Sequence, residues 1–181
     1  MRARRTRRAA RRGHSACMDV APPNWRPDRV FVQAGASARD ARVAGLGLRW
    51  DAPPGSWGAD WRAAMQVSAG VWSTGLTEPA GAARRHTAQV VVMPLVRWQP
   101  QQAASPWFME AGLGLSLHDR RYAVGYLRQG SRLNFQEEMA LGRLLGGGQA
   151  LSLRLTHMSN AGLRKPNPGE TWWSVRWDFA L

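Results

Sequence analysis

Leu151-Ser152-Leu153-Arg154-Leu155-Thr156-His157-Met158-Ser159 is the stretch that decides the fold, because apolar and polar residues alternate along its first part. Alternation with a period of two is typical of a β-strand that has one face in an apolar environment. Side chains two residues apart share a face of a strand. The stretch therefore predicts a strand whose apolar row of leucines is continued by a base, His157, and a hydroxyl, Ser159.

A second alternating run, Trp173–Leu181, follows a turn-forming segment, Pro166-Asn167-Pro168-Gly169. Proline fixes its backbone and glycine tolerates left-handed conformations, so this segment favours a reversal of the chain. Together the two runs predict a hairpin that brings Glu170 back toward the end of the first strand.

Comparable alternating segments recur from Val30 to the end, separated by clusters of turn residues such as Gly146-Gly147-Gly148. An even number of strands joined by hairpins favours an all-β fold, an eight-stranded antiparallel up-and-down transmembrane β-barrel. The predicted strands are 30–38, 41–51, 60–75, 85–98, 106–118, 130–145, 149–159 and 171–181.

Two features indicate that the apolar face of this barrel points outward to lipid. The segments reach the 9–11 residues that a tilted membrane strand needs. Tryptophans gather near the strand ends, as in interfacial aromatic belts. One conflict remains, because adjacent Glu137 and Glu138 must point to opposite faces, which puts one carboxylate in the apolar row. The tryptophans are Trp50, Trp57, Trp61, Trp98, Trp107, Trp172 and Trp173.

The N-terminal segment differs from the rest in composition. Of the formal net charge of +13, seven positive charges come from arginines in Met1–Arg12, which leaves +6 for the remainder. We interpret residues 1–28 as an arginine-rich segment, disordered or related to export, and residues 29–181 as the barrel. A nucleic-acid or lipid-binding arm is the alternative, since like-charge runs often contact anions. Met1–Val20 lacks the apolar core of a signal peptide, so we expect either a start that is extended or mis-chosen upstream of the true signal, or the absence of that signal.

His157, Ser159 and Glu170 form a candidate catalytic group. A serine nucleophile needs a base that takes its proton and a third group that orients the base. On one strand face, His157 lies within reach of Ser159, and Glu170 is expected to hold the imidazole from across the turn. Backbone amides near 160–162, or the side chain of Asn167, are candidates for stabilising an oxyanion.

The alternative interpretation of His157 and Ser159 is structural, because isolated polar residues on strands often only satisfy local hydrogen bonds. Polar groups at membrane depth are functional candidates by default, which favours the catalytic interpretation. His86 and His118 have no acidic or cysteine partner at ligand spacing, so no metal site is expected. The single cysteine, Cys17, permits no intrachain disulfide.

The residues resemble a known family, the PagL-type lipid A 3-O-deacylases of Gram-negative outer membranes. The resemblance is carried by His157-Met158-Ser159-Asn160-Ala161-Gly162 and Lys165-Pro166-Asn167-Pro168-Gly169-Glu170, with support from the segments 110–116, 119–121 and 135–142. It implies an outer-membrane barrel with an exterior active site that hydrolyses the 3-position ester of lipid A and releases a 3-hydroxy fatty acid.

By position, the resemblance implies Ser159 as nucleophile, His157 as general base and Glu170 as the residue that orients it. It implies oxyanion or loop-ordering roles for Asn160, Gly162 and Asn167. No metal or organic cofactor is implied. The expected partners are lipid A or lipopolysaccharide and the outer membrane, with no nucleic acid, and a homodimer is left open. The alternatives are a non-enzymatic outer-membrane barrel, structural or binding, and a soluble barrel that carries lipid inside.

Overall fold

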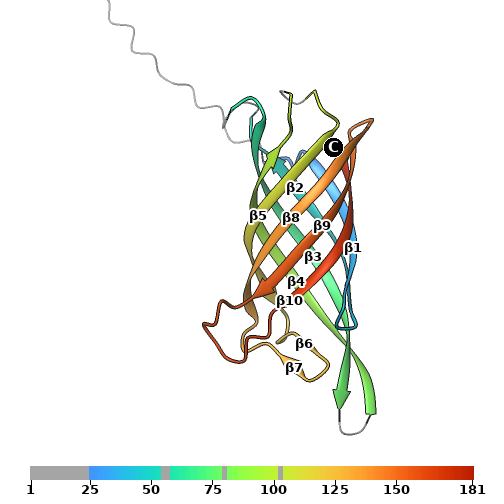
Figure 1. Ribbon diagram of the computed structural model, residues 1–181, viewed down its shortest axis with the longest axis vertical. Helices are drawn as coiled ribbons and strands as arrows, with labels where there is room; N and C mark the ends of the chain where they lie inside the picture. The colour runs from blue at the N-terminus through green and yellow to red at the C-terminus, as the bar shows by residue number, and fades with distance from the viewer. Residues whose placement is uncertain (1–24, 54–57, 79–80, 102–103) are drawn as a thin grey trace, which may run out of the picture.

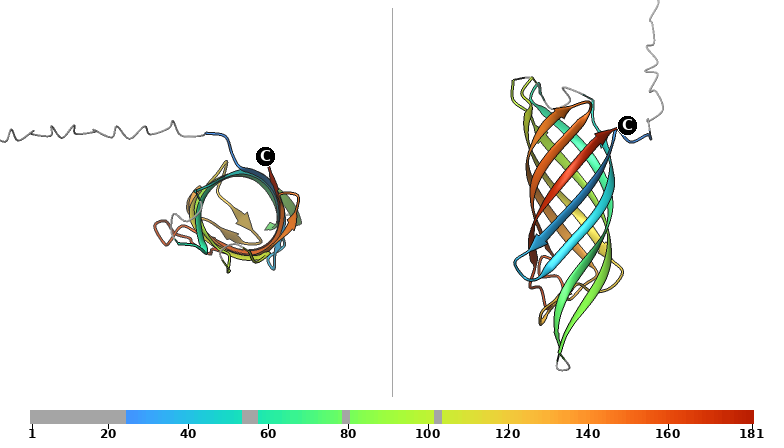
Figure 2. Two further views of the ribbon diagram at one scale, coloured as in Figure 1. Left: turned by 90° about the horizontal axis from the view of Figure 1, so that it is seen from above. Right: turned by 90° about the vertical axis from the view of Figure 1, so that its right-hand side faces the viewer.

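The computed structural model describes residues 25–53, 58–78, 81–101 and 104–181. Eight long strands in these residues close into one antiparallel barrel, in which each strand pairs with its neighbour in the chain and β1 pairs with β10 (Figures 1 and 2). The predicted eight-stranded barrel is confirmed. The strands are β1 Arg29–Ser37, β2 Ala41–Asp51, β3 Trp61–Glu78, β4 Gly81–Trp98, β5 Trp107–His118, β8 Leu133–Gly146, β9 Gln149–Ser159 and β10 Glu170–Ala180.

Two short strands, β6 Ala123–Val124 and β7 Leu127–Arg128, pair within the connection between β5 and β8. They were not anticipated, because two-residue strands carry no periodic signal in the sequence. Of the segment 1–28 that we expected to be disordered or export-related, residues 1–24 lie outside the described residues.

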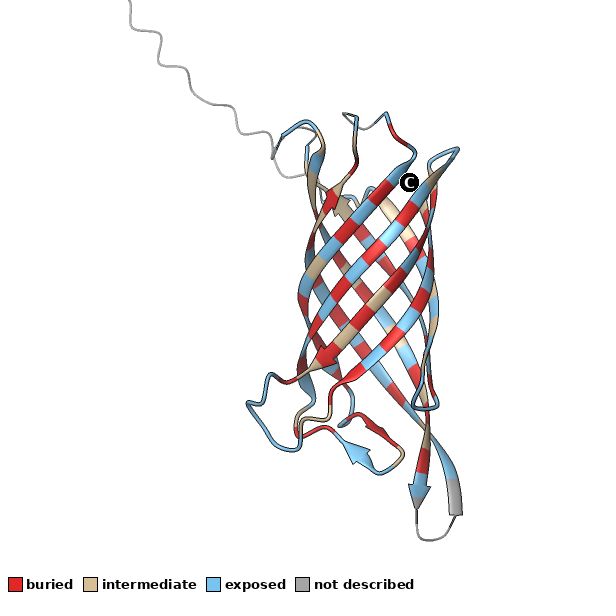
Figure 3. Cartoon of the chain, viewed as in Figure 1, coloured by how far each residue is buried: buried red, intermediate tan, exposed pale blue. Residues whose placement is uncertain are grey.

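The apolar face of the barrel points outward, as the alternation predicted. Figure 3 shows buried and exposed residues alternating along every long strand, because successive side chains leave opposite faces. The inward set is mostly polar and the outward set apolar, the pattern of a barrel that faces lipid. Large apolar side chains on the outer surface include Val32, Leu46, Met65, Val71, Val90, Val92, Met109, Leu113, Leu115, Leu117, Met139, Leu141, Leu151, Leu153, Val175 and Trp177.

A network of buried charges fills the interior. Glu110 on β5 accepts hydrogen bonds from Arg49, Arg97 and Arg154, which reach it from three other strands. Glu138 on β8 also accepts from Arg154. Buried carboxylates are stable only when they are paired and hydrogen-bonded, so these contacts tie opposite walls of the barrel together.

The two ends of the barrel differ in their connections. One end, here called the loop end, carries the 119–132 and 160–169 connections; the C-terminus lies at the other end (Figure 1). Longer connections are typical of the external side of outer-membrane barrels. Among the described residues, no helix is long and apolar enough to cross a membrane.

The tryptophans only partly form the expected belt. Trp61 and Trp107 are exposed at the end that carries the C-terminus, and Trp173 is exposed near the loop end. The assignment of Trp172 to the belt was wrong, because its ring is buried inside and packs edge-on against Trp72, 4.7 Å away between centroids. Trp172 and Trp173 are consecutive residues of β10, so their rings lie on opposite faces of the sheet.

We expect Leu153→Arg, near the middle of β9, to destabilise the inserted barrel by about 2–4 kcal/mol, because a charge there would face the hydrocarbon core. Leu153 is half exposed on the outer surface. Urea unfolding in lipid vesicles measures the loss. Leu163→Arg in the exposed 160–169 connection is the matched control; an equal loss in both variants would argue against a lipid-facing β9.

Candidate active site

His157 and Ser159 lie at the loop end of β9, on the outer face of the barrel. Both residues continue the outward row of Leu151, Leu153 and Leu155, while Met158 between them is fully buried. The backbone alternation alone explains this placement. The structure therefore brings a base and a hydroxyl together where the lipid-facing wall meets the loops.

Thr171 on β10 holds the imidazole of His157. The two residues are direct partners in the antiparallel register, and His157 Nδ1 lies 2.7 Å from Thr171 Oγ1. Gly169, which has a positive φ of 61°, passes close to the other side of the ring. A Cβ added at Gly169 would lie 2.9 Å from His157 Cε1. Thr171 was not among the residues expected at the site.

Glu170 points into the barrel and does not meet His157. It is buried and pairs in register with Met158, whereas His157 leaves the opposite face. Its Oε2 accepts a hydrogen bond from the Tyr122 hydroxyl at 3.0 Å, and its Oε1 accepts one from the Thr171 amide at 3.2 Å. The predicted direct contact between Glu170 and His157 is thus corrected to an indirect one through Thr171. Consecutive residues of a strand point to opposite faces, so Glu170 points inward while Thr171 points outward to His157.

Tyr122 keeps that inward carboxylate paired. It lies in the connection between β5 and β6, and its burial, then the neighbouring Glu170 carboxylate, raise the pKa of Tyr122 well above its ordinary value. Its hydroxyl therefore stays protonated and donates to Glu170. Tyr122 also packs against Trp72, with 5.1 Å between ring centroids.

The residues after Ser159 form a tightly hydrogen-bonded loop. Asn160 N donates to Asn167 Oδ1 at 2.9 Å, Asn160 Nδ2 donates to Arg164 O at 2.6 Å, and Gly162 N donates to Asn160 Oδ1 at 3.0 Å. Asn160, Asn167 and Gly162 therefore order the loop. The backbone amide of Ala161 donates a hydrogen bond to Ser159 Oγ at 3.3 Å.

Ser159 and His157 form no hydrogen bond to each other among the described residues; Ser159 Oγ accepts from Ala161 instead. Contacts between a nucleophile and its base are often loose without substrate and tighten on binding.

Two small cavities flank the pair. One, of about 200 Å³, is lined by His157, Thr171, Gly169 and Arg39, whose guanidinium donates to Gly169 O at 2.8 Å. The other, of about 170 Å³, is lined by Phe135, the β8 partner of Ser159, together with Leu115, Leu133 and Leu163. The first cavity also includes Glu170 in its lining, and the second also includes the polar residues Ser131, Asn134, Asn160 and Arg164. His157 thus borders the first cavity, and Asn160, which follows Ser159, borders the second.

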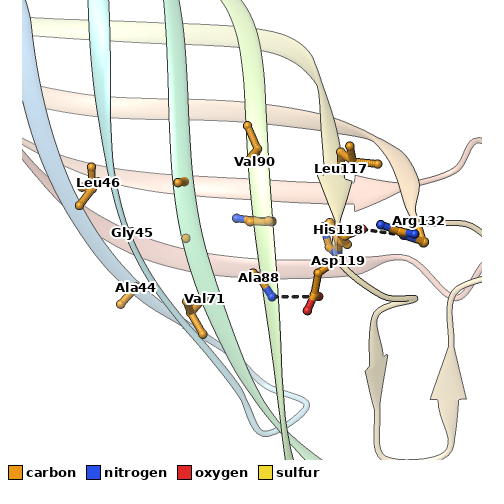
Figure 4. A pocket seen from close by; sticks show the side chains of 13 residues that line it. Ala44, Gly45, Leu46, Val71, Ala88, Val90, Leu117, His118, Asp119 and Arg132 are labelled. Atoms are coloured by element: carbon orange, nitrogen blue, oxygen red, sulfur yellow. Dashed lines mark hydrogen bonds between the residues drawn. The ribbon is translucent and has the colours of Figure 1, made fainter.

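A wider groove of about 600 Å³ lies on another part of the wall, across β2, β3, β4 and β5 (Figure 4). Asp119 accepts from Ala88 N there, and Arg132 donates to His118 O. No serine lines the groove, and His118 is fully buried. The pair of His157 and Ser159 lies apart from this groove, near the two smaller cavities.

No cluster of three or more metal-ligating side chains occurs in the part of the chain that the structure describes. His86 is exposed on β4 and His118 is buried at the end of β5. Neither lies with the β9 pair.

Gly169→Ala is expected to lower ester hydrolysis by roughly 10- to 100-fold, the scale at which misplaced catalytic groups lose rate. An added methyl group would collide with the His157 ring, and an alanine would be strained at this positive φ. Turnover by the refolded variant measures the loss. Gly162→Ala has the same kind of backbone strain with open space around its Cβ, so it separates strain from collision.

The closed lipid-facing barrel and its exterior pair of histidine and serine define a class, the outer-membrane β-barrel enzymes. Comparison with known proteins makes the class specific. The family profile described as lipid A 3-O-deacylase (PagL) matches residues 44–180. The chain belongs to this family of outer-membrane ester hydrolases.

Individual relatives agree with the family assignment. The chain is 31% identical over 143 residues to the lipid A deacylase PagL of Pseudomonas aeruginosa, covering 77% of this chain and 79% of that protein. It is 32% identical over 98 residues to the lipid A deacylase PagL of Bordetella bronchiseptica, covering 54% and 50%. The crystal structure of the outer membrane enzyme PagL superposes with a TM-score of 0.63 at 26% identity, covering 84% of this chain and 99% of that chain.

Proposed function

We propose that this protein hydrolyses the 3-position acyl ester of lipid A, with Ser159 as nucleophile and His157 as general base. The observation that carries the proposal is the outward pair on β9, which lies on a lipid-facing wall in a chain of the lipid A deacylase family. An ester reached from this side of the barrel belongs to a membrane lipid.

In the proposed reaction, the protonated Nδ1 of His157 donates a hydrogen bond to Thr171 Oγ1. Nε2 of His157 takes the hydroxyl proton of Ser159 as Ser159 Oγ attacks the ester carbonyl. The bond from the carbonyl carbon to the sugar oxygen breaks, and His157 returns the proton to that oxygen. Water then attacks the acyl-serine, His157 takes a proton from it, and Ser159 regains its hydrogen as the 3-hydroxy fatty acid leaves.

We assign the amide of Ala161, which donates to Ser159 Oγ at 3.3 Å, as a donor to the developing oxyanion. We assign Asn160, Gly162 and Asn167 to holding that amide in place, since their hydrogen bonds fix the loop. Glu170 acts on the pair from inside the barrel, because its carboxylate accepts a hydrogen bond from the backbone amide of Thr171. A preorganised donor aimed at developing charge is the largest electrostatic contribution in many such reactions.

The surroundings suit an anionic lipid with long chains. The cavity beside Phe135 offers three leucine side chains to an acyl chain, and the cavity with Arg39 offers a guanidinium to a polar headgroup. Exposed basic residues surround the loop end, and positive charge favours phosphorylated lipid surfaces. These residues are Arg39, Arg42, Arg84, Arg120, Arg121, Arg128, Arg132, Arg164 and Lys165.

The test uses the full chain refolded in detergent micelles with purified lipid A, followed by mass spectrometry of both products. We expect lipid A to lose one 3-hydroxyacyl chain and an equal amount of free 3-hydroxy fatty acid to appear. Phosphatidylethanolamine serves as the competing lipid. Hydrolysis of the phospholipid with lipid A left intact would overturn the substrate assignment and keep the esterase.

A further inference from the structure

We propose that Glu137, on the outer face of β8, positions His157 together with Thr171, so that the charged partner of the base comes from β8. This inference rests on the proposed function. It adds a positioning carboxylate to the reaction that the hairpin of β9 and β10 does not supply.

The register places these three residues side by side. Glu137 on β8 is the direct partner of His157 on β9, and His157 is the direct partner of Thr171 on β10. Directly opposed side chains of antiparallel strands have Cβ atoms roughly 4.5–5.5 Å apart. Glu137 and Thr171 are both exposed, so a row of carboxylate, imidazole and hydroxyl crosses the outer surface.

The position of Glu137 is otherwise unfavourable. Its neighbours on the outer face of β8 are Phe135 and Met139, and its partner on β5 is Leu113. A carboxylate in such a lipid-facing row is costly and marks a functional group by default. The adjacent Glu138 points inward and is paired with Arg154, so the interior network does not require Glu137.

The chemistry requires what Glu137 offers. Thr171 fixes the orientation of the ring through Nδ1, but a neutral hydroxyl gives little stabilisation to the imidazolium that forms during proton transfer. A carboxylate beside the ring supplies the opposite charge, and its attraction is stronger at an apolar surface than in water. Glu170 cannot supply it there, because its carboxylate lies inside the barrel with Tyr122.

The test compares Glu137→Gln, Glu137→Asp and Thr171→Val with the wild-type full chain in detergent micelles. Two readouts are measured: kcat and KM for lipid A, and the rate at which a fluorophosphonate probe labels Ser159. Asp40→Asn is the matched control, since Asp40 is an exposed carboxylate at the same end that pairs with Arg84.

We expect Glu137→Gln to lower kcat and the labelling rate by roughly 100-fold, the scale of a general-base contribution, with KM little changed. Glu137→Asp should recover part of the loss, and Asp40→Asn should retain the wild-type kcat. Because Glu137 and Thr171 act through the same ring, their double variant should lose less than the product of the two single losses.

Two outcomes overturn the inference and differ from failure of the proposed function. A Glu137→Gln variant with wild-type kcat and labelling rate would show that His157 works without this carboxylate. A change confined to KM would place Glu137 in substrate binding alone. A wild-type protein without activity on lipid A would instead remove the proposed function.

Discussion

Ser159→Ala is expected to abolish hydrolysis of lipid A while the barrel remains folded. Removing the nucleophile of a serine esterase lowers kcat by at least about 10⁴-fold, since the base and oxyanion donor then act only on water. The missing hydroxyl accepts one hydrogen bond, from Ala161 N at 3.3 Å on the exterior, and contributes little to the interior. Turnover of lipid A by the refolded variant measures the effect.

The matched control for Ser159→Ala is Ser73→Ala, which removes an exterior hydroxyl toward the loop end of β3, outside both small cavities. Ser73 Oγ accepts one hydrogen bond, from Arg84 Nη1 at 3.4 Å. Its turnover should equal that of wild type. Full activity in Ser159→Ala would eliminate the serine mechanism and leave His157 to activate water directly.

Glu110→Gln is expected to have the largest effect on stability, with a loss of about 3–5 kcal/mol in the free energy of unfolding. The carboxylate accepts hydrogen bonds from Arg49, Arg97 and Arg154, and all four side chains are buried. An amide of the same shape removes the negative charge and leaves three guanidinium groups with less compensation. Urea unfolding in lipid vesicles reports the change.

Asp40→Asn makes the same chemical change at an exposed ion pair, Arg84 Nη2 to Asp40 Oδ1 at 3.0 Å. Exposed pairs contribute about 1 kcal/mol or less, so this variant should remain close to wild type. If both variants lost the same small amount, the interior network would fill space without stabilising the barrel.

Most of the fold was accessible from the sequence because strand alternation is a local property. The apolar rows Trp107–Leu117 and Trp173–Leu181 predicted both the strands and the faces that the structure shows. Alternation could not show that β3 and β4 extend to Glu78 and Gly81, beyond the predicted ends at 75 and 85. Their additional residues lie past the apolar rows, where the period-two pattern is weak.

The candidate site was accessible only in part. His157 and Ser159 followed from the parity of β9, and the same argument applied to β10 would have placed Thr171 in the outward row of Trp173 and Val175. Glu170 was instead predicted to orient His157, because a carboxylate is the usual third group of such a site, although alternation along β10 places its side chain on the inner face. The role of Arg39 at the loop could not be foreseen, because it comes from the turn between β1 and β2 and reaches Gly169 across 130 positions of the chain.

By itself, the sequence determined which residues share a face of each strand, because the period of two is set by the backbone alone. It therefore determined that a base and a hydroxyl end the leucine row of β9. Only the tertiary structure decided which residues stand beside them. The register between strands depends on loop geometry and barrel closure, and a shift of one residue exchanges inside for outside. That register set Glu137 and Thr171 on either side of His157, and the fold of the 119–132 connection brought Tyr122 to Glu170 inside the barrel.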